Sequence, residues 1–305
     1  MRRPSTKVGA CFGRWAMVSD ERLAWVNGRL VGEAEPSLSL LERGLTLGDG
    51  VFETMLAARS NLFRPTEHLE RLAQGASLLA IALPSPEHLL AAVQDTLSAT
   101  HLPAAVVRLT VSRGPDPGRG VDVSPALTPT IIVRAMPYQP RTVRRTGLTA
   151  VFPSLRRNEN SPLCRVKSLS YADSVLARLE ARRRGADEAI LLNTRGEVCC
   201  ASTANLFVVK RDTIMTPPVE SGALPGVTRR CLLELAAARG LTVREAPVLP
   251  EDLWAADEAF LTNTVIGVAG LTSVEGRPIG AGRLGERTRA LAADYRRLVR
   301  CSLAG

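Results

Sequence analysis

Apolar residues recur along this chain of 305 residues with two different spacings. Short runs of aliphatic and β-branched residues predict strands, whereas apolar positions three or four apart predict helices. The first strand signal, residues 25–31, surrounds the pair Asn27-Gly28, which is typical of a tight hairpin turn. Further strands are predicted at 105–111, 130–134, 148–152, 188–193 and 205–209.

Helical spacing marks four segments. The first opens at a Thr66 cap, and leucines at positions 69, 72, 78 and 79 share one of its faces. The others are predicted at 86–100, 171–184 and 227–239, with Gly185 and Gly240 ending the last two. Helices that alternate with strands indicate α/β units.

The length of the chain favours two domains over one. Residues 112–128 form a long loop rich in Gly and Pro, and such loops on compact domains are usually functional. The segment 137–141 has the composition of a linker. We therefore expect a flexible extension at 1–22, a small domain at 23–139 and a larger domain at 140–305.

The composition, with 45% hydrophobic and 23% charged residues, is that of an ordinary globular chain. No run of 18 apolar residues occurs, and the N-terminus lacks the apolar stretch of a signal peptide. We therefore expect a cytoplasmic protein that does not enter a membrane.

Several enzyme classes fit the sequence poorly. The six cysteines have no CxxC spacing, and the three histidines form no HExxH motif, so we expect reduced thiols and no metal site. The GxSxG motif of many hydrolases is also missing.

The net charge of +9 is compatible with nucleic acid, but the basic residues are dispersed among acidic ones and only 4% of residues are aromatic. An arginine-rich solvated surface explains this charge, and we expect no nucleic-acid partner. Of the 39 basic residues only three are lysines, at positions 7, 167 and 210. Lysine alone among basic side chains can lose its proton near neutral pH and form a Schiff base. Lys7 and Lys210 have the surroundings of solvent-exposed lysines, which leaves Lys167 as the candidate nucleophile.

Two features favour an anionic ligand. Gly226 precedes the helix start at Val227-Thr228, where unpaired backbone N–H groups can bind an anion, although many such junctions bind nothing. Arg113 and Arg119 in the long loop can clamp carboxylates, or can simply face solvent.

Taken in order, six segments resemble the fold-type IV pyridoxal-phosphate enzymes. This class IV aminotransferase family includes branched-chain and D-amino-acid aminotransferases and 4-amino-4-deoxychorismate lyase. The resemblance spans residues 25–280 and implies two α/β domains, a small N-terminal one and a larger, barrel-like C-terminal one, with pyridoxal 5'-phosphate between them. The segments are 47–54, 67–72, 167–171, 204–207, 224–229 and 261–264.

By this resemblance Lys167 is the catalytic lysine that forms a Schiff base with the cofactor. Tyr171 donates to the phenolic oxygen of the cofactor, unless it is only a packed aromatic residue of the helix. The other residues implied to bind the cofactor are Arg71, Cys200, Val227, Thr228 and Thr264. Those implied to bind substrate are Phe52, Arg113 and Arg119.

Cys200 departs from the family pattern. Most relatives carry, four residues after the hairpin glycine, a glutamate that keeps the pyridine nitrogen protonated. Counting from Gly196 gives Cys200, and Glu197 is on the wrong spacing. Either the nitrogen lacks an acidic partner here, which weakens the electron sink that transamination needs, or another acidic residue takes its place.

The loop Arg113–Gly120 and the segment Asn158–Leu163 are similar to those of aminodeoxychorismate lyases. The resemblance therefore implies a lyase that converts 4-amino-4-deoxychorismate to 4-aminobenzoate and pyruvate, a step toward folate. The alternative is an aminotransferase for D-amino or branched-chain amino acids. In either case it implies a small anionic amino substrate and a homodimer in which the long loop closes the partner's site. A basic regulatory protein without chemistry is the third hypothesis.

Overall fold

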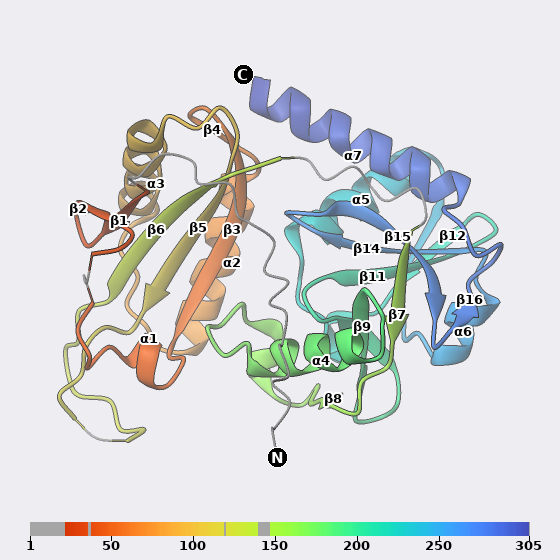
Figure 1. Ribbon diagram of the computed structural model, residues 1–305, viewed down its shortest axis with the longest axis horizontal. Coiled ribbons are helices and arrows are strands. Elements are labelled where there is room, and N and C mark those ends of the chain that lie inside the picture. The colour runs from red at the N-terminus through yellow and green to blue at the C-terminus, as the bar shows by residue number, and fades with distance from the viewer. Residues whose placement is uncertain (1–21, 36–37, 119, 140–146, 305) are drawn as a thin grey trace, which may run out of the picture.

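The computed structural model describes residues 22–35, 38–118, 120–139 and 147–304. Its strands form two sheets that lie side by side (Figure 1). Of the extension expected at 1–22, only Arg22 is among the described residues.

The first sheet has six antiparallel strands in the order β2-β1-β6-β5-β3-β4. Helices α2 and α3 cover one face and bury an apolar core against it (Figure 1). The strands are β1 Leu23–Val26, β2 Arg29–Gly32, β3 Gly50–Ala58, β4 Asn61–Leu62, β5 Ala105–Ser112 and β6 Thr130–Pro137. The helices are α1 Arg43–Thr46, α2 Pro65–Leu78 and α3 Pro86–Thr100.

Two local expectations for this sheet have different outcomes. The hairpin at Asn27-Gly28 is confirmed, because both residues have positive φ, at 45° and 90°. The Thr66 cap is wrong: the cap residue lies two positions earlier, at Arg64 in a left-handed conformation, and α2 begins at Pro65. Proline at the first helical position needs no hydrogen-bonded N–H, which favours this earlier start.

The second sheet is mixed and curls into a half-barrel (Figure 1). Its main path runs β10-β9-β7-β15-β14-β11-β12-β13, while β16 pairs with β15 and β8 with β9. The strands are β7 Leu148–Val151, β8 Arg156–Arg157, β9 Glu188–Asn193, β10 Val198–Ala201, β11 Asn205–Lys210, β12 Thr213–Thr216, β13 Thr242–Glu245, β14 Glu258–Asn263, β15 Gly267–Val274 and β16 Arg277–Pro278. The helical segments are η1 Pro162–Arg165, α4 Ala172–Arg183, η2 Val219–Ser221, α5 Val227–Ala238, α6 Pro250–Ala255 and α7 Glu286–Ala304. The predicted α/β class with a barrel-like second part is confirmed.

The two sheets share a hydrophobic cluster. Leu56 and Phe63 of the first sheet's part pack in one cluster with Phe207, Phe260 and Tyr295 of the second. Helix α7 runs along the top of the view from the second sheet toward β4 (Figure 1), where the Asn61 amide donates to the Leu303 carbonyl at 3.2 Å. The strands on either side of the expected boundary near residue 140 belong to different sheets, and the division into domains stays a prediction.

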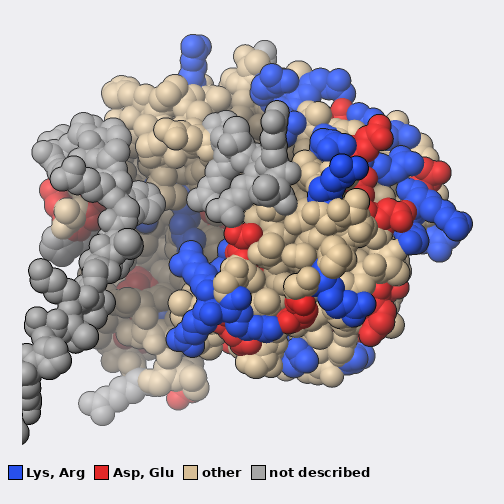
Figure 2. Space-filling model, turned by 45° about the vertical axis from the view of Figure 1, so that its right-hand side comes forward, with Lys and Arg blue, Asp and Glu red and all other residues tan. Residues whose placement is uncertain are grey.

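The surface and the helices bear on possible partners. On the face that Figure 2 presents, basic side chains are interspersed with acidic ones over the right-hand part. Among the described residues, no helix is long and apolar enough to cross a membrane.

Candidate functional site

A cavity of about 770 Å³ lies where the two sheets meet. Its lining combines residues of β3, α2 and β5 with residues of β10, α4 and the start of α5. Eight of the residues that the sequence singled out line it together, from six separate stretches of chain. They are Phe52, Arg71, Lys167, Tyr171, Cys200, Val227, Thr228 and Thr264.

Lys167 is held against strand β3. The Phe52 amide donates to the Lys167 carbonyl at 2.9 Å, and the Leu169 amide donates to the Gly50 carbonyl at 2.9 Å. The lysine Nζ lies 3.2 Å from the Tyr171 hydroxyl and 4.2 Å from the centre of the Phe52 ring. These contacts fix the amine in the cavity wall.

Burial lowers the pKa of Lys167 to about 8, and the charges of Arg71 and Arg108 act in the same direction. A fraction of this amine is therefore neutral near pH 7, which makes it a usable nucleophile. Lys210, in contrast, is exposed and pairs with Asp257. Of the two described lysines, only Lys167 faces the cavity.

Tyr171 lies at the cap position of α4, where the chain turns into the helix. Its ring meets Phe52 edge-to-face at 5.2 Å, and its hydroxyl faces the lysine amine. Burial raises the pKa of Tyr171, so the phenol keeps its proton at neutral pH and can donate it. Packing and donation are compatible here, and the donor role to a cofactor stays a prediction.

The start of α5 forms the second half of the site. Gly226 is the cap residue and carries no capping side chain, which leaves the first helix amides available. A Cβ at Gly226 would lie 2.1 Å from Asn205 Oδ1, so this close approach requires glycine. Arg71 reaches the same point, because its Nη1 donates to the Pro225 carbonyl at 3.1 Å. A guanidinium and a helix start thus converge on one place.

The donor set of the cavity fits a phosphate group. The lining contains the cations Arg71, Arg108, Arg157, Lys167 and Arg178. Asp173 is the one carboxylate among the described lining residues. Thr262 also lines the cavity, and its buried hydroxyl has no hydrogen-bond partner among the described residues. An excess of positive charge, a helix start and a spare hydroxyl are suited to a dianion.

The surroundings of Cys200 differ from the rest of the lining. Strand β10 has a register shift between Val198 and Cys200, and the Sγ atoms of Cys199 and Cys200 are 3.7 Å apart. The contact with Cys199 and the charge of Arg157 lower the pKa of Cys200. Arg157 itself donates to the carbonyls of Gly222 and Cys164, both at 2.9 Å, and has no carboxylate partner among the described residues.

Two nearby carboxylates, those of Glu197 and Glu188, are bound by other side chains. Glu197 accepts from Arg195 at 2.8 Å and from Ser221 at 3.0 Å, and it does not line the cavity. Glu188, behind the wall, is bound by Arg178 and by the Ser202 hydroxyl. Neither carboxylate faces the cavity beside Cys200.

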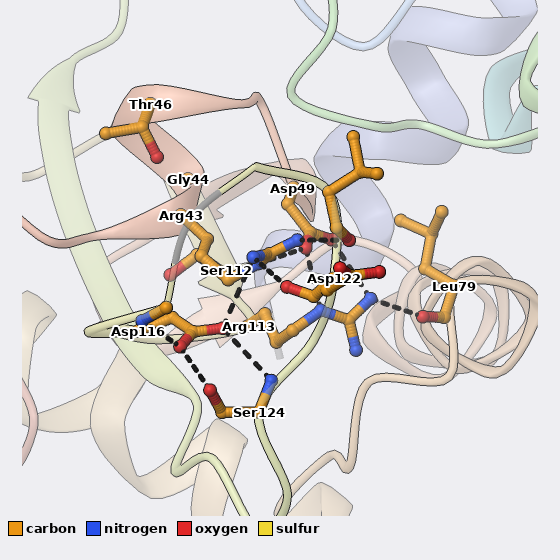
Figure 3. Close-up of polar contacts among 12 residues, drawn as sticks. Arg43, Gly44, Thr46, Asp49, Leu79, Ser112, Arg113, Asp116, Asp122 and Ser124 are labelled. Carbon is orange, nitrogen blue, oxygen red and sulfur yellow. Dashed lines mark hydrogen bonds and ion pairs between the residues drawn. The ribbon is translucent and has the colours of Figure 1, made fainter.

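Of the two predicted substrate arginines only Arg113 is among the described residues, and it does not line this cavity. Arg113 lies against Asp49 at 2.7 Å and donates to the Leu79 carbonyl (Figure 3). It also donates to the Ala80 carbonyl. Arg119 lies outside the described residues. A role for either in binding substrate stays a prediction.

Arg108 and Arg157 line the cavity but were missed from the sequence. The guanidinium of Arg108 lies 3.7 Å from the centre of the Phe52 ring, and its one hydrogen bond to a described residue goes to Thr110. A charged residue in the middle of the apolar strand β5 was the available signal. Arg157 gave none, because it lies in a polar stretch.

Comparison with known proteins identifies the family. The sequence family described as amino-transferase class IV matches residues 50–274. The chain belongs to this family. A branched-chain-amino-acid aminotransferase of Salmonella typhimurium is 32% identical over 281 residues, which cover 89% of this chain and 91% of that protein.

Solved structures of the family agree with the fold. The T.th. branched-chain amino acid aminotransferase, solved with pyridoxamine 5'-phosphate, is 30% identical, has a TM-score of 0.84, and is matched over 91% of this chain and 93% of its own. The 4-amino-4-deoxychorismate lyase of Pseudomonas aeruginosa is 29% identical, with a TM-score of 0.80 over 90% of this chain and 98% of its own.

The protein is therefore an enzyme of the class IV aminotransferase family, and its cofactor is pyridoxal 5'-phosphate. When bound, this cofactor supplies an aldehyde for the amine and a ring that withdraws electrons. Arg71 and the α5 start would hold its phosphate and Lys167 would meet its aldehyde, and these roles stay predictions.

Proposed function

We propose that the enzyme is an aminotransferase that acts on branched-chain amino acids. The relatives support this alternative better than the lyase function that the sequence favoured, because branched-chain enzymes predominate among the matching proteins. The observation in the site that supports it is Arg108, a guanidinium without a carboxylate partner among the described residues, lying against the apolar Phe52 ring.

In this proposal Arg108 binds the carboxylate of the amino acid, and Phe52 packs against the apolar side chain. A guanidinium pairs with a carboxylate through two parallel hydrogen bonds, so it also fixes the orientation of the substrate. Lys167 then moves the proton at the substrate's α-carbon, for which its pKa of about 8 is well suited. Tyr171, at 3.2 Å from that amine, orients it.

In the same proposal, Arg71, the helix start at Val227, and the hydroxyls of Thr228 and Thr264 hold the phosphate. The Thr228 hydroxyl lies 3.3 Å from the Tyr295 hydroxyl. Burial holds the pKa of Tyr295 above its usual range, so this phenol stays protonated and keeps Thr228 oriented.

The lyase remains a second candidate, because one observation favours it. Cys200 and the carbonyl-bound Arg157 occupy the wall where an acid is expected, and the expulsion of a leaving group depends less on that acid than amino-group exchange does. The lyase of known structure that resembles this chain makes the candidate specific.

One experiment separates the two functions. The purified holoenzyme is incubated with leucine and 2-oxoglutarate, with D-alanine and 2-oxoglutarate, and with 4-amino-4-deoxychorismate. We expect glutamate and the branched keto acid to accumulate in the first reaction. Release of pyruvate and 4-aminobenzoate in the third reaction, without exchange in the first, would refute the aminotransferase and establish the lyase.

We also propose that the enzyme is a homodimer whose long loop reaches the partner's site. Arg43 of α1 donates to Asp116 at 3.3 Å and to the Asp122 carbonyl at 2.9 Å, which anchors the loop to α1 (Figure 3). Apolar side chains nevertheless face outward, with Val121 81% exposed and Leu45 67% exposed. Exposed apolar patches on a fixed base are typical of interaction surfaces.

The dimer can be tested by mass measurement in solution. Wild type should have twice the chain mass, and Val121→Asp together with Leu45→Asp should lower it to one chain and reduce turnover. The exposed Leu249 on the second sheet's side provides the control, because Leu249→Asp should change neither. A fully active wild-type monomer would contradict the proposal.

A further inference from the structure

The guanidinium of Arg71 is tied down by a buried carboxylate. Glu53 of β3 is completely buried, and its two oxygens accept from Arg71 Nε and Nη2, both at 2.7 Å. The same carboxylate accepts from His68 Nδ1 at 2.7 Å. Although burial opposes them, the hydrogen bonds from His68 and Arg71 lower the pKa of Glu53 to about 2. Because an ionised carboxylate can only accept, His68 carries its proton on Nδ1.

This arrangement leaves part of Arg71 free for a ligand. A guanidinium has five N–H donors. Glu53 takes two of them and the Pro225 carbonyl takes a third, so two remain beside the start of α5. The side chain is therefore held by one edge while its other donors face the place where the helix amides converge.

We propose that Glu53 and His68 are positioning residues that set Arg71 for the phosphate of the cofactor. Arginine has many rotamers, and ordering it at the moment of binding would weaken affinity. Glu53 orders it beforehand, and His68 holds Glu53. The inference rests on the proposed phosphate site and extends it to two residues that do not touch the phosphate.

Glu53 can act on phosphate binding in two opposite ways. As a negative charge beside the site it weakens the attraction of an anion, so its removal would tighten phosphate binding. As a positioning group it orders the donor, so its removal would weaken phosphate binding. The sign of the change therefore decides between the two roles.

The test compares affinities for pyridoxal 5'-phosphate and for pyridoxal, which lacks the phosphate. Full-length protein, freed of cofactor by dialysis, is titrated with each compound, and the ratio of the two dissociation constants is measured. We expect Glu53→Gln to reduce the preference for the phosphorylated compound about 10-fold or more, the effect of a lost charge-assisted contact, with little change for pyridoxal. An unchanged or increased preference would overturn the proposal.

Matched variants separate positioning from a general loss of structure. Glu42 is a buried carboxylate elsewhere in the first sheet's part, bound by the hydroxyls of Ser112 and Thr130, so Glu42→Gln should leave the preference unchanged. His68→Leu removes the donor to Glu53 and should lower the preference, whereas His68→Asn keeps a donor near Nδ1 and should restore it. If Glu53→Gln fails to fold, the pair of His68 variants decides the question alone.

Arg71→Ala separates failure of this inference from failure of the phosphate site. If Arg71→Ala leaves the preference unchanged, the phosphate binds elsewhere, and both the proposed phosphate site and the positioning role of Glu53 and His68 are refuted. If Arg71→Ala lowers the preference and the Glu53 and His68 variants do not, only the positioning role is overturned.

Discussion

The two walls of the cavity satisfy their charges in different ways. At the wall formed by β3 and α2, Arg71 is paired with Glu53, and Glu53 is also bound by His68. At the wall formed by β10, Arg157 is bound only by backbone carbonyls among the described residues, and a thiol, Cys200, lies beside it. At the first wall a cation is paired with a carboxylate, whereas at the second no described carboxylate pairs with Arg157.

This difference indicates different tasks. A buried charge that is fully hydrogen-bonded is rigid, which suits the binding of a fixed group such as phosphate. A cation that no carboxylate neutralises keeps its full effect on nearby groups, so the residue beside it can change the protonation of a bound ring and thereby the chemistry. We therefore expect changes at the first wall to affect cofactor binding, and changes at the second to affect the balance between reactions.

The largest effect is expected at Lys167, which lies between the two walls. In the proposed function Lys167 is both the amine that meets the aldehyde and the group that moves the proton, so in Lys167→Ala turnover should fall by at least about a thousandfold. Product formation and the visible absorbance of the bound cofactor are the measurements. Lys210→Ala should alter neither, because its amine is exposed and pairs with Asp257. Equal losses in both variants would refute the assignment.

Arg71→Ala comes next and tests the first wall. Loss of a charge-assisted contact to phosphate typically costs about 1.5–3 kcal/mol, which corresponds to cofactor retention about 10- to 150-fold weaker on dialysis. Arg108→Ala is the control in the same cavity: it should retain the cofactor and raise KM for the amino acid instead. Tight retention in Arg71→Ala would show that the phosphate binds elsewhere.

The sequence predicted the residues around the proposed phosphate site and Lys167 better than the charges beside Cys200. The segments around Arg71, Lys167 and Gly226 follow family patterns, and the structure brings them together in one cavity. The predicted strands and three of the four predicted helix starts lie close to the observed ones, because the spacing of apolar residues depends directly on which positions are buried. The start of α2 was misjudged, since a capping side chain was expected where proline and a left-handed Arg64 begin the helix.

What the sequence could not give depended on contacts between distant residues. Arg113 has the motif of a substrate-binding arginine, yet Asp49, 64 positions away, engages it. Arg108 and Arg157 face the cavity only because two sheets meet there. A local window of residues therefore does not show that Arg113 is paired with Asp49, or that Arg108 faces the cavity.

The pH dependence of Lys167 should sharpen the comparison. Burial places its pKa at about 8, below the usual 10.5, so the neutral, reactive amine accumulates as pH rises through about 8. In addition to burial, which lowers this pKa, the negative charge of Glu53 raises it and the positive charge of Arg108 lowers it. In cofactor-free protein, the rate of reaction with an aldehyde probe should therefore have its midpoint near pH 8, lower in Glu53→Gln and higher in Arg108→Gln. A midpoint near 10.5 in wild type would contradict the buried environment of the amine.

The smallest expected effect, and the sharpest test of the second wall, is at Cys200. A thiol is a weak hydrogen-bond partner and cannot hold a proton on a ring nitrogen as a carboxylate does, and the nearby Arg157 disfavours that proton further. Expulsion of a leaving group tolerates this better than amino-group exchange, which draws on the electron-withdrawing ring. Cys200→Glu should therefore raise the ratio of amino-group exchange to pyruvate release several-fold, a change of about 1 kcal/mol in relative barrier. Cys199→Ser is the matched control, since the Cys199 thiol does not line the cavity and its replacement should leave the ratio unchanged. If the ratio in Cys200→Glu equals that of wild type, residue 200 does not set the chemistry. The positive charge of Arg157 must then be neutralised by another group when cofactor and substrate bind.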